Sequence, residues 1–402
     1  MFLAALAIYG ICCPGQTAYD QYARLAEALL QGSISLPERP PHLEMAEWQG
    51  RAYFTNPPTP AFLITPFLWI AKHEPLRGWL VGLNGGWVFP YGLFQTGLSI
   101  LLGALSVALA RVALGRARVS RRAANWGAVL FGFGSVHWYH ATIGSVWYLA
   151  QIVHGTLMWL LVVEWMGRAR PALMGLALAA AFWCRMETLV AVPFVLVALP
   201  HRWLHPRTDE IVPRPRLGWL AAFAAPIVGI LILNSAYNYV RFGVFGNAAY
   251  EVLIAKGPGD PLYPRGLFDL SYWHGHVHVL FYAMPIFTRE FPWALPSLGG
   301  LAIWITTPAF IWALRAPWDR LTAGCWVGVV LFMGVLLGFG GTGMTQLGYR
   351  FALDFYSLLT VLTIRGMDRP IRWWHETAIL FGVLVNAWSV MVLNFLQIGR
   401  LY

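Results

Sequence analysis

The sequence predicts an all-α protein, built as a polytopic bundle of transmembrane helices. Three observations lead to this fold class. The mean hydropathy is +0.57. Of the 402 residues, 58% are hydrophobic and 11% are charged, whereas about a quarter of the residues of soluble domains are charged. Several apolar runs approach or exceed the roughly 20 residues that a helix needs to cross a bilayer, and the arginines are gathered between these runs.

The apolar runs predict about eleven membrane spans. Residues 1–13 form the first, which we take as a retained span because no small-residue cleavage site of a signal peptide follows it; a truncated or misassigned start is the open alternative. Two short pieces, 172–184 and 188–200, are expected to form one bent helix or a tight hairpin. The ten later spans are approximately residues 86–110, 123–140, 147–165, 172–184, 188–200, 217–240, 294–314, 321–340, 350–365 and 374–396.

The arginines predict how the bundle is oriented. They concentrate in alternate short loops, and cytoplasmic loops of membrane proteins carry an excess of Lys and Arg. The N-terminus is therefore expected in the cytoplasm and the C-terminus outside. The arginines that set this orientation are Arg111, Arg116, Arg118, Arg121 and Arg122, then Arg168 and Arg170, then Arg202, Arg207, Arg214 and Arg216, then Arg315 and Arg320, then Arg365, Arg369 and Arg372.

Two long external loops follow from this topology, within a single transmembrane domain over 1–402 that has no soluble domain at either end. The first loop is 14–85, and its stretch 20–66 holds five acids in a protein of net charge +10. Apolar residues at helical spacing predict an amphipathic interfacial helix over 17–31, and the short apolar piece 61–71 is expected to be interfacial or re-entrant. The second loop covers 242–293.

The excess of arginine and the four cysteines are both interpreted as features of a membrane protein. Arginine binds phosphate bidentately, so we expect membrane lipid head groups as partners and no nucleic acid. The four cysteines show no spacing typical of zinc or of a disulfide framework, and we take them as small apolar residues. No cofactor is predicted with certainty, and a divalent metal is kept as an option.

The first loop has a recognisable layout. Asp20 follows the first span, the amphipathic helix ends in Leu29-Leu30-Gln31-Gly32, and Gly50-Arg-Ala-Tyr53 leads through Pro57-Pro58 to Leu63-Ile-Thr-Pro66. This layout resembles the first external loop of the GT-C class of membrane glycosyltransferases, and most of all the bacterial relatives of the protein O-mannosyltransferases. The late stretch Gly348-Tyr-Arg350-Phe-Ala-Leu-Asp354 looks like the late arginine motif of the same family.

The resemblance implies a sugar transfer from a polyprenyl-phosphate carrier at the outer face of the membrane. By position, Asp20 would be the general base or help to hold a metal, and Arg350 would contact the carrier phosphate. A positioned carboxylate contributes roughly 10²–10⁴-fold to such a reaction. The competing interpretations stay open: Asp20 caps the surface helix, and Arg350 reaches head groups or pairs with Asp354. Gln21 stands where many relatives carry a second acid.

Further residues are candidates for contacts with the donor. Tyr53, Lys256 and Arg265 lie in the external loops, where they are candidate phosphate or sugar ligands. Arg185 and Glu187 lie deep in an apolar region, where charges are rare and usually functional; the alternative is a pair at the outer end of a helix hairpin.

Histidines supply the candidate metal ligands. In an extended strand His274, His276 and His278 would all point one way, as metal ligands do; a solvated interfacial loop is the alternative. His137, His140 and His154 lie in or beside spans, where we expect structural histidines rather than ligands of a haem or chlorophyll.

The sequence thus predicts a multi-pass glycosyltransferase of a bacterial cytoplasmic membrane, with long external loops and a polyprenyl-phosphate-linked sugar as substrate. Two alternatives remain. One is a catalytically degenerate scaffold subunit with protein partners in a larger membrane complex. The other is a lipid or solute transporter, although neither an inverted repeat nor a pair of broken helices is visible.

Overall fold

The computed structural model describes residues 1–36, 44–86, 88–117, 119–198, 217–254, 263–297, 299–343, 346–368 and 370–398. Helices dominate it, as predicted, and the strands that it describes form two small antiparallel pairs. The first part of the chain contains α1 (Phe2–Ile11), α2 (Gln21–Leu30), β1 (Met45–Trp48), β2 (Arg51–Phe54), α3 (Thr59–Ala71), α4 (Leu76–Leu83), α5 (Tyr91–Arg116), α6 (Arg121–Gly132), α7 (His137–Ile143), α8 (Val146–Met166), α9 (Pro171–Phe182), η1 (Met186–Ala191) and α10 (Val192–Ala198).

The second part begins with the long helix α12. Its elements are α12 (Leu217–Phe242), α13 (Ala249–Ile254), η2 (Leu270–Tyr272), α14 (Trp273–Val277), η3 (His278–Tyr282), β3 (Ile286–Phe287), β4 (Ala294–Leu295), α15 (Ile303–Thr306), η4 (Pro308–Arg315), α16 (Arg320–Leu337), η5 (Arg350–Asp354), α17 (Tyr356–Met367), α18 (Trp373–Val390) and η6 (Met391–Phe395).

Five of the described helices are long and apolar enough to cross a membrane: α5, α8, α12, α16, and α18 continued by η6. The protein is therefore a membrane protein. The other expected spans coincide with shorter helical pieces; for example, α6 ends at Gly132 and α7 begins only at His137. The expected span 294–314 is wrong at its start, because residues 294–295 form strand β4 and helix appears only from Ile303.

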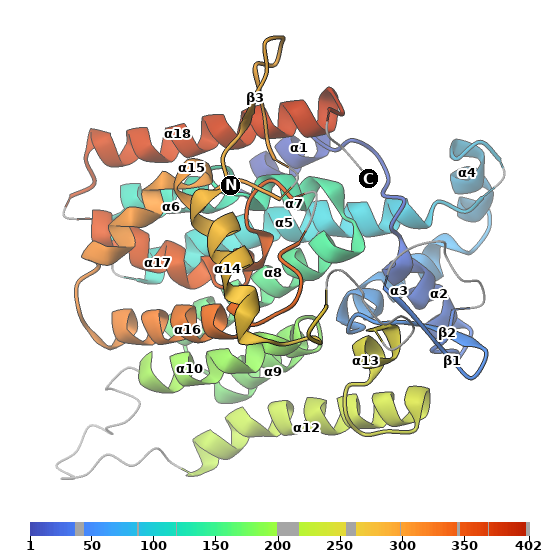
Figure 1. The fold of residues 1–402 in the computed structure, drawn as a ribbon. Coiled ribbons are helices and arrows are strands. Elements are labelled where there is room, and N and C mark those ends of the chain that lie inside the picture. Colours follow the sequence, from blue (N-terminus) through green and yellow to red (C-terminus); the bar gives the residue numbers. More distant parts are fainter. Residues whose placement is uncertain are drawn as a thin grey trace.

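The first loop packs onto the helical bundle. In α2 the side chains of Tyr22, Leu25 and Ala26 are fully buried, and this helix lies against α3 and α5. The strands β1 and β2 form a hairpin whose two loop residues, Gln49 and Gly50, both have positive φ, as the tightest hairpin turns require. In Figure 1 this loop lies at the end of α5, near α13.

Helix α12 lies at the edge of the molecule beneath α9 (Figure 1) and packs mainly on that helix. Glycine permits their close approach: a Cβ on Gly175 of α9 would collide with the backbone carbonyl of Phe223 on α12. Small residues at such positions allow the backbones of membrane helices to pack closely.

Substituting Gly175 by Ala is expected to lower the free energy of unfolding by about 1–3 kcal/mol, because the two backbones must separate. The matched control is Gly229→Ala on α12, where a Cβ meets no atom within 4 Å; this change is expected to be neutral or to stabilise by about 0.5–1 kcal/mol. Thermal unfolding in detergent micelles measures both. Equal melting temperatures for the two variants would contradict the proposed α9–α12 contact.

Candidate active site

A cavity of about 550 Å³ lies where the first loop meets the start of α8, the α9–η1 turn, α13 and the chain around Arg350. Its wall contains residues from both stretches that carry the family resemblance. The lining residues are Tyr19, Glu44, Thr55, Asn56, Pro57, Val146, Trp147, Ala150, Gln151, Cys184, Arg185, Met186, Glu187, Leu189, Val190, Asn247, Tyr250, Tyr263, Leu267, Phe268, Val335, Leu336, Phe339, Gly341, Thr342, Gly343, Arg350 and Phe351.

Of the two arginines among the described residues of the cavity wall, Arg185 has carboxylate partners and Arg350 has none. Arg350 is 8% exposed. Its backbone N–H donates to Gln346 Oε1 at 3.0 Å, and its guanidinium lies near the rings of Phe351 and Tyr148, 5.2 and 5.9 Å from their centroids. Nε and Nη1 have no hydrogen-bond partner among the described residues. A buried charge without a partner is costly, so this guanidinium is suited to receive an anion.

Glu44 is a carboxylate that the first loop contributes to the cavity wall. Its Oε1 accepts a hydrogen bond from Trp147 Nε1 at 3.1 Å, and its Oε2 accepts one from Thr55 Oγ1 at 3.0 Å. The backbone of Glu44 has φ +71°, a left-handed conformation that costs a non-glycine residue of order 1–3 kcal/mol and tends to occur at functional sites. Two neutral donors thus orient this carboxylate without cancelling its charge.

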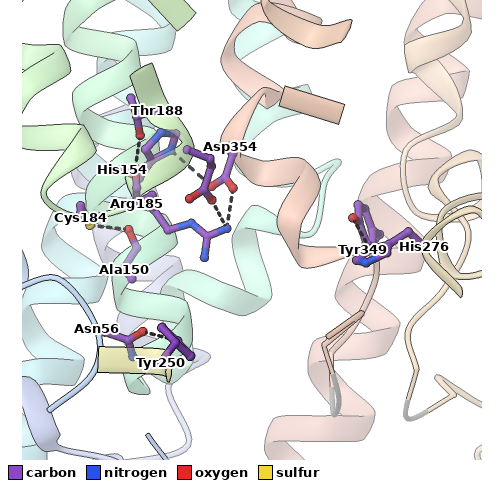
Figure 2. Close-up of polar contacts among 11 residues, drawn as sticks. Asn56, Ala150, His154, Cys184, Arg185, Thr188, Tyr250, His276, Tyr349 and Asp354 are labelled. Carbon is purple, nitrogen blue, oxygen red and sulfur yellow. Dashed lines mark hydrogen bonds and ion pairs between the residues drawn. The ribbon is translucent and has the colours of Figure 1, made fainter. Parts of the chain in front are cut away.

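The second charged cluster surrounds Arg185. Its Nη2 contacts Asp354 Oδ2 at 2.7 Å and Glu187 Oε1 at 2.5 Å, and His154 Nδ1 lies 3.4 Å from Asp354 Oδ1. Asp354 and His154 are both fully buried. Figure 2 shows Arg185 reaching from the α9–η1 turn towards Asp354. Asp354, considered from the sequence as a partner for Arg350, is thus the partner of Arg185 instead.

The structure separates the predicted base from the cavity. Asp20 occupies the N-cap position of α2 but makes no capping hydrogen bond. Its carboxylate, 10% exposed, pairs with Arg24 Nε at 2.6 Å. The cavity is lined by its neighbour Tyr19 and, in the described part of the chain, does not include Asp20. Tyr19 packs against Trp147 with tilted rings, 5.0 Å between their centroids, and so connects the start of α2 to the indole that holds Glu44.

Two other predicted donor contacts, Tyr53 and Arg265, lie apart from the cavity as its described lining residues define it. Tyr53 is buried and packs edge-on against Phe242. The Arg265 side chain is 64% exposed and lies 3.8 Å from Asp269. Lys256 lies outside the described residues. Of the substrate contacts predicted from the sequence, Arg350, Arg185 and Glu187 are the ones that the described structure brings together in the cavity wall.

The three histidines of the second loop do not form the expected strand. His274 and His276 belong to α14, and His278 begins η3, so consecutive side chains turn around a helix instead of alternating. His276 is buried between Tyr349 Oη and the Phe339 carbonyl, each 2.7 Å from a ring nitrogen; Figure 2 shows its contact with Tyr349. Nowhere in the described ranges do three His, Cys, Asp or Glu side chains come together as metal ligands.

Polar residues that sequence reasoning missed complete the cavity. Glu44 was visible only as one of the five acids of residues 20–66. Gln151 is one of the few polar residues in the apolar helix α8, a position where a polar residue is a functional signal; its amide has no hydrogen-bond partner in the described structure. Tyr250 Oη donates to Asn56 Oδ1 at 2.9 Å (Figure 2), which joins α13 to the first loop.

No protein-family model and no curated protein matches the chain. Among solved structures, an oligosaccharyltransferase from Archaeoglobus fulgidus is similar over 98% of this chain and 54% of its own, with 12% identity and a TM-score of 0.48. ArnT from Cupriavidus metallidurans, bound to undecaprenyl phosphate, is similar over 93% of this chain and 61% of its own, with 15% identity and a TM-score of 0.49.

The archaeal oligosaccharyltransferase AglB, in complex with an inhibitory peptide and a dolichol-phosphate, is similar with a TM-score of 0.44 and 12% identity. AglB and ArnT are GT-C glycosyltransferases, the class that the first loop resembles. The chain spans between about half and three fifths of the length of these proteins. At such identities and TM-scores the likeness does not establish an activity.

Proposed function

We propose that this chain is a membrane glycosyltransferase that moves a sugar from a polyprenyl-phosphate donor to an acceptor. The observation that carries the proposal is the buried guanidinium of Arg350, which faces a cavity that also contains the carboxylates of Glu44 and Glu187. The phosphate of a lipid-linked sugar would supply the missing anion, since charge-assisted hydrogen bonds to phosphate are strong. A carboxylate in the same cavity supplies a proton acceptor.

The chemical character of the wall supports a donor with a lipid part and a sugar part. Leu189 and Val190 of η1 and Leu336 of α16 contribute aliphatic surface, whereas Asn56 and Gln151 contribute amides. Aliphatic side chains suit a prenyl chain, and amides suit sugar hydroxyls. A donor made only of sugar and phosphate would leave the aliphatic part of the wall without a partner.

The number of spans and their orientation in the membrane are part of the same proposal. We retain about eleven spans within one domain, an N-terminus in the cytoplasm and long loops outside a bacterial cytoplasmic membrane. The cavity between the first loop, α13 and the second loop would then open towards the external face.

The proposal is tested with the purified protein in liposomes, supplied with polyprenyl-phosphate-linked hexoses and a membrane extract as the source of acceptors. Release of free polyprenyl phosphate, measured by mass spectrometry, is the expected result. Absence of release from every donor, with undecaprenyl phosphate failing to raise the melting temperature, would overturn the proposal in favour of a scaffold.

Asp20→Asn distinguishes the two roles considered for this acid. Because its carboxylate pairs with Arg24 beside the cavity, we expect transfer to fall by less than about tenfold and the stability by about 1 kcal/mol or less. A catalytic base would cost roughly 10²–10⁴-fold. The transfer rate under saturating donor decides between them: a loss above 100-fold with an unchanged melting temperature would return the role of base to Asp20.

A further inference from the structure

Among the described residues, two carboxylates line the cavity, and their surroundings differ in charge. Glu187 and Asp354 share the guanidinium of Arg185, so the charge of Glu187 is engaged in an ion pair. Glu44 is held by an indole N–H and a hydroxyl, which orient it and leave its negative charge available. A base needs both a fixed position and a free electron pair, and Glu44 combines the two.

The position of Glu44 relative to Arg350 follows from one turn of α8. Trp147 donates to Glu44, and the next residue, Tyr148, presents its ring to the Arg350 guanidinium. Consecutive residues of a single helix thus contact the carboxylate and the cation. A phosphate bound at Arg350 would therefore hold its attached sugar near this first turn of α8, within the cavity that Glu44 also lines.

Tyr250 lies near Glu44 in this wall. Burial, and after it the nearby Glu44 carboxylate, raise the pKa of Tyr250 well above its usual value. The Tyr250 hydroxyl remains protonated and donates to Asn56. A neutral hydroxyl and an amide beside an oriented carboxylate form a polar surface suited to a hydroxyl-bearing acceptor.

We propose that Glu44 is the catalytic base of sugar transfer, an inference that rests on the proposed function. The acceptor hydroxyl oxygen forms a bond to the anomeric carbon of the donor while the bond from that carbon to the phosphate oxygen breaks. The acceptor proton passes to a carboxylate oxygen of Glu44, and the electron pair leaves with the polyprenyl phosphate, whose charge Arg350 neutralises. Hydrogen bonds from Trp147 and Thr55 hold the Glu44 carboxylate in place, and they help to maintain the left-handed backbone of this residue.

Glu44→Gln keeps the shape of the side chain and removes the basic oxygen. We expect kcat to fall by about 10²–10⁴-fold, while the KM for the donor and the binding of undecaprenyl phosphate change by less than about threefold. Glu251→Gln, one residue from Tyr250 on α13 and exposed, is the matched control and should retain wild-type kcat. Binding of the lipid phosphate also checks that the variant is folded.

A second variant separates chemistry from packing. Glu44→Ala is expected to be inactive and to regain at least tenfold activity when formate is added, because a small carboxylate can take the vacated position; a structural role would give no recovery. Retention of more than a tenth of wild-type kcat by Glu44→Gln, with Arg350→Gln inactive, would overturn the role of Glu44 and leave the proposed function intact. If wild type itself transfers no sugar, the proposed function fails, and the role of Glu44 with it.

Discussion

Substituting Arg350 by Gln is expected to lower kcat/KM for the lipid-linked donor by about 100- to 1,000-fold, the range found when a preorganised electrostatic donor is removed from an active site. Arg350 is 8% exposed, and two nitrogens of its guanidinium have no partner among the described residues. A phosphate bound there would gain a strong charge-assisted contact that a neutral amide cannot replace.

The same change should raise the stability of the free protein. A buried cation without a counter-charge is unfavourable, so Arg350→Gln should melt at a higher temperature than wild type in the absence of lipid. Added undecaprenyl phosphate should stabilise wild type and leave the variant unchanged. Arg289→Gln, at an exposed position, serves as the control. A variant that is less stable and still active would show that Arg350 is a packing residue.

Substituting Arg185 by Met is expected to have the largest effect on stability, a loss of about 3–5 kcal/mol. This change leaves the fully buried Asp354 carboxylate and Glu187 without their shared cation. The double variant Arg185→Met/Asp354→Leu removes the stranded charge and should recover much of the loss. Thermal unfolding in micelles measures the effect, with the exposed Arg168→Met as the control; a wild-type melting temperature for Arg185→Met would rule out a structural ion pair.

The long apolar helices were predictable because each is encoded by one continuous run of apolar residues. The expected spans 147–165 and 321–340 appear as Val146–Met166 and Arg320–Leu337. The span expected at 294–314 failed because apolar composition alone does not distinguish a helix from a strand followed by a turn. Residues 294–295 pair with 286–287, a choice that depends on a distant partner.

The site was harder to predict, because it is made by contacts between segments far apart in the sequence. Arg350 could be proposed from its motif. That Asp354 does not pair with Arg350 depends on Arg185, which binds this acid from 169 residues away in the sequence. Among the five acids of residues 20–66, Glu44 is distinguished by its hydrogen bond from the Trp147 side chain, 103 residues further on. Periodicity and composition carry no information on such pairings.

The sparse packing of α12 makes the position of this helix dependent on the thickness of the bilayer. Only 6% of its most apolar stretch is buried, compared with 78% for α8, so acyl chains are its main surroundings. Its 26 residues extend for about 39 Å, which exceeds the roughly 30 Å hydrocarbon thickness of a typical membrane. Such hydrophobic mismatch is relieved by tilting. Acyl-chain length is therefore expected to set the tilt of α12 and, through Gly175, the position of α9, whose end leads directly to Arg185.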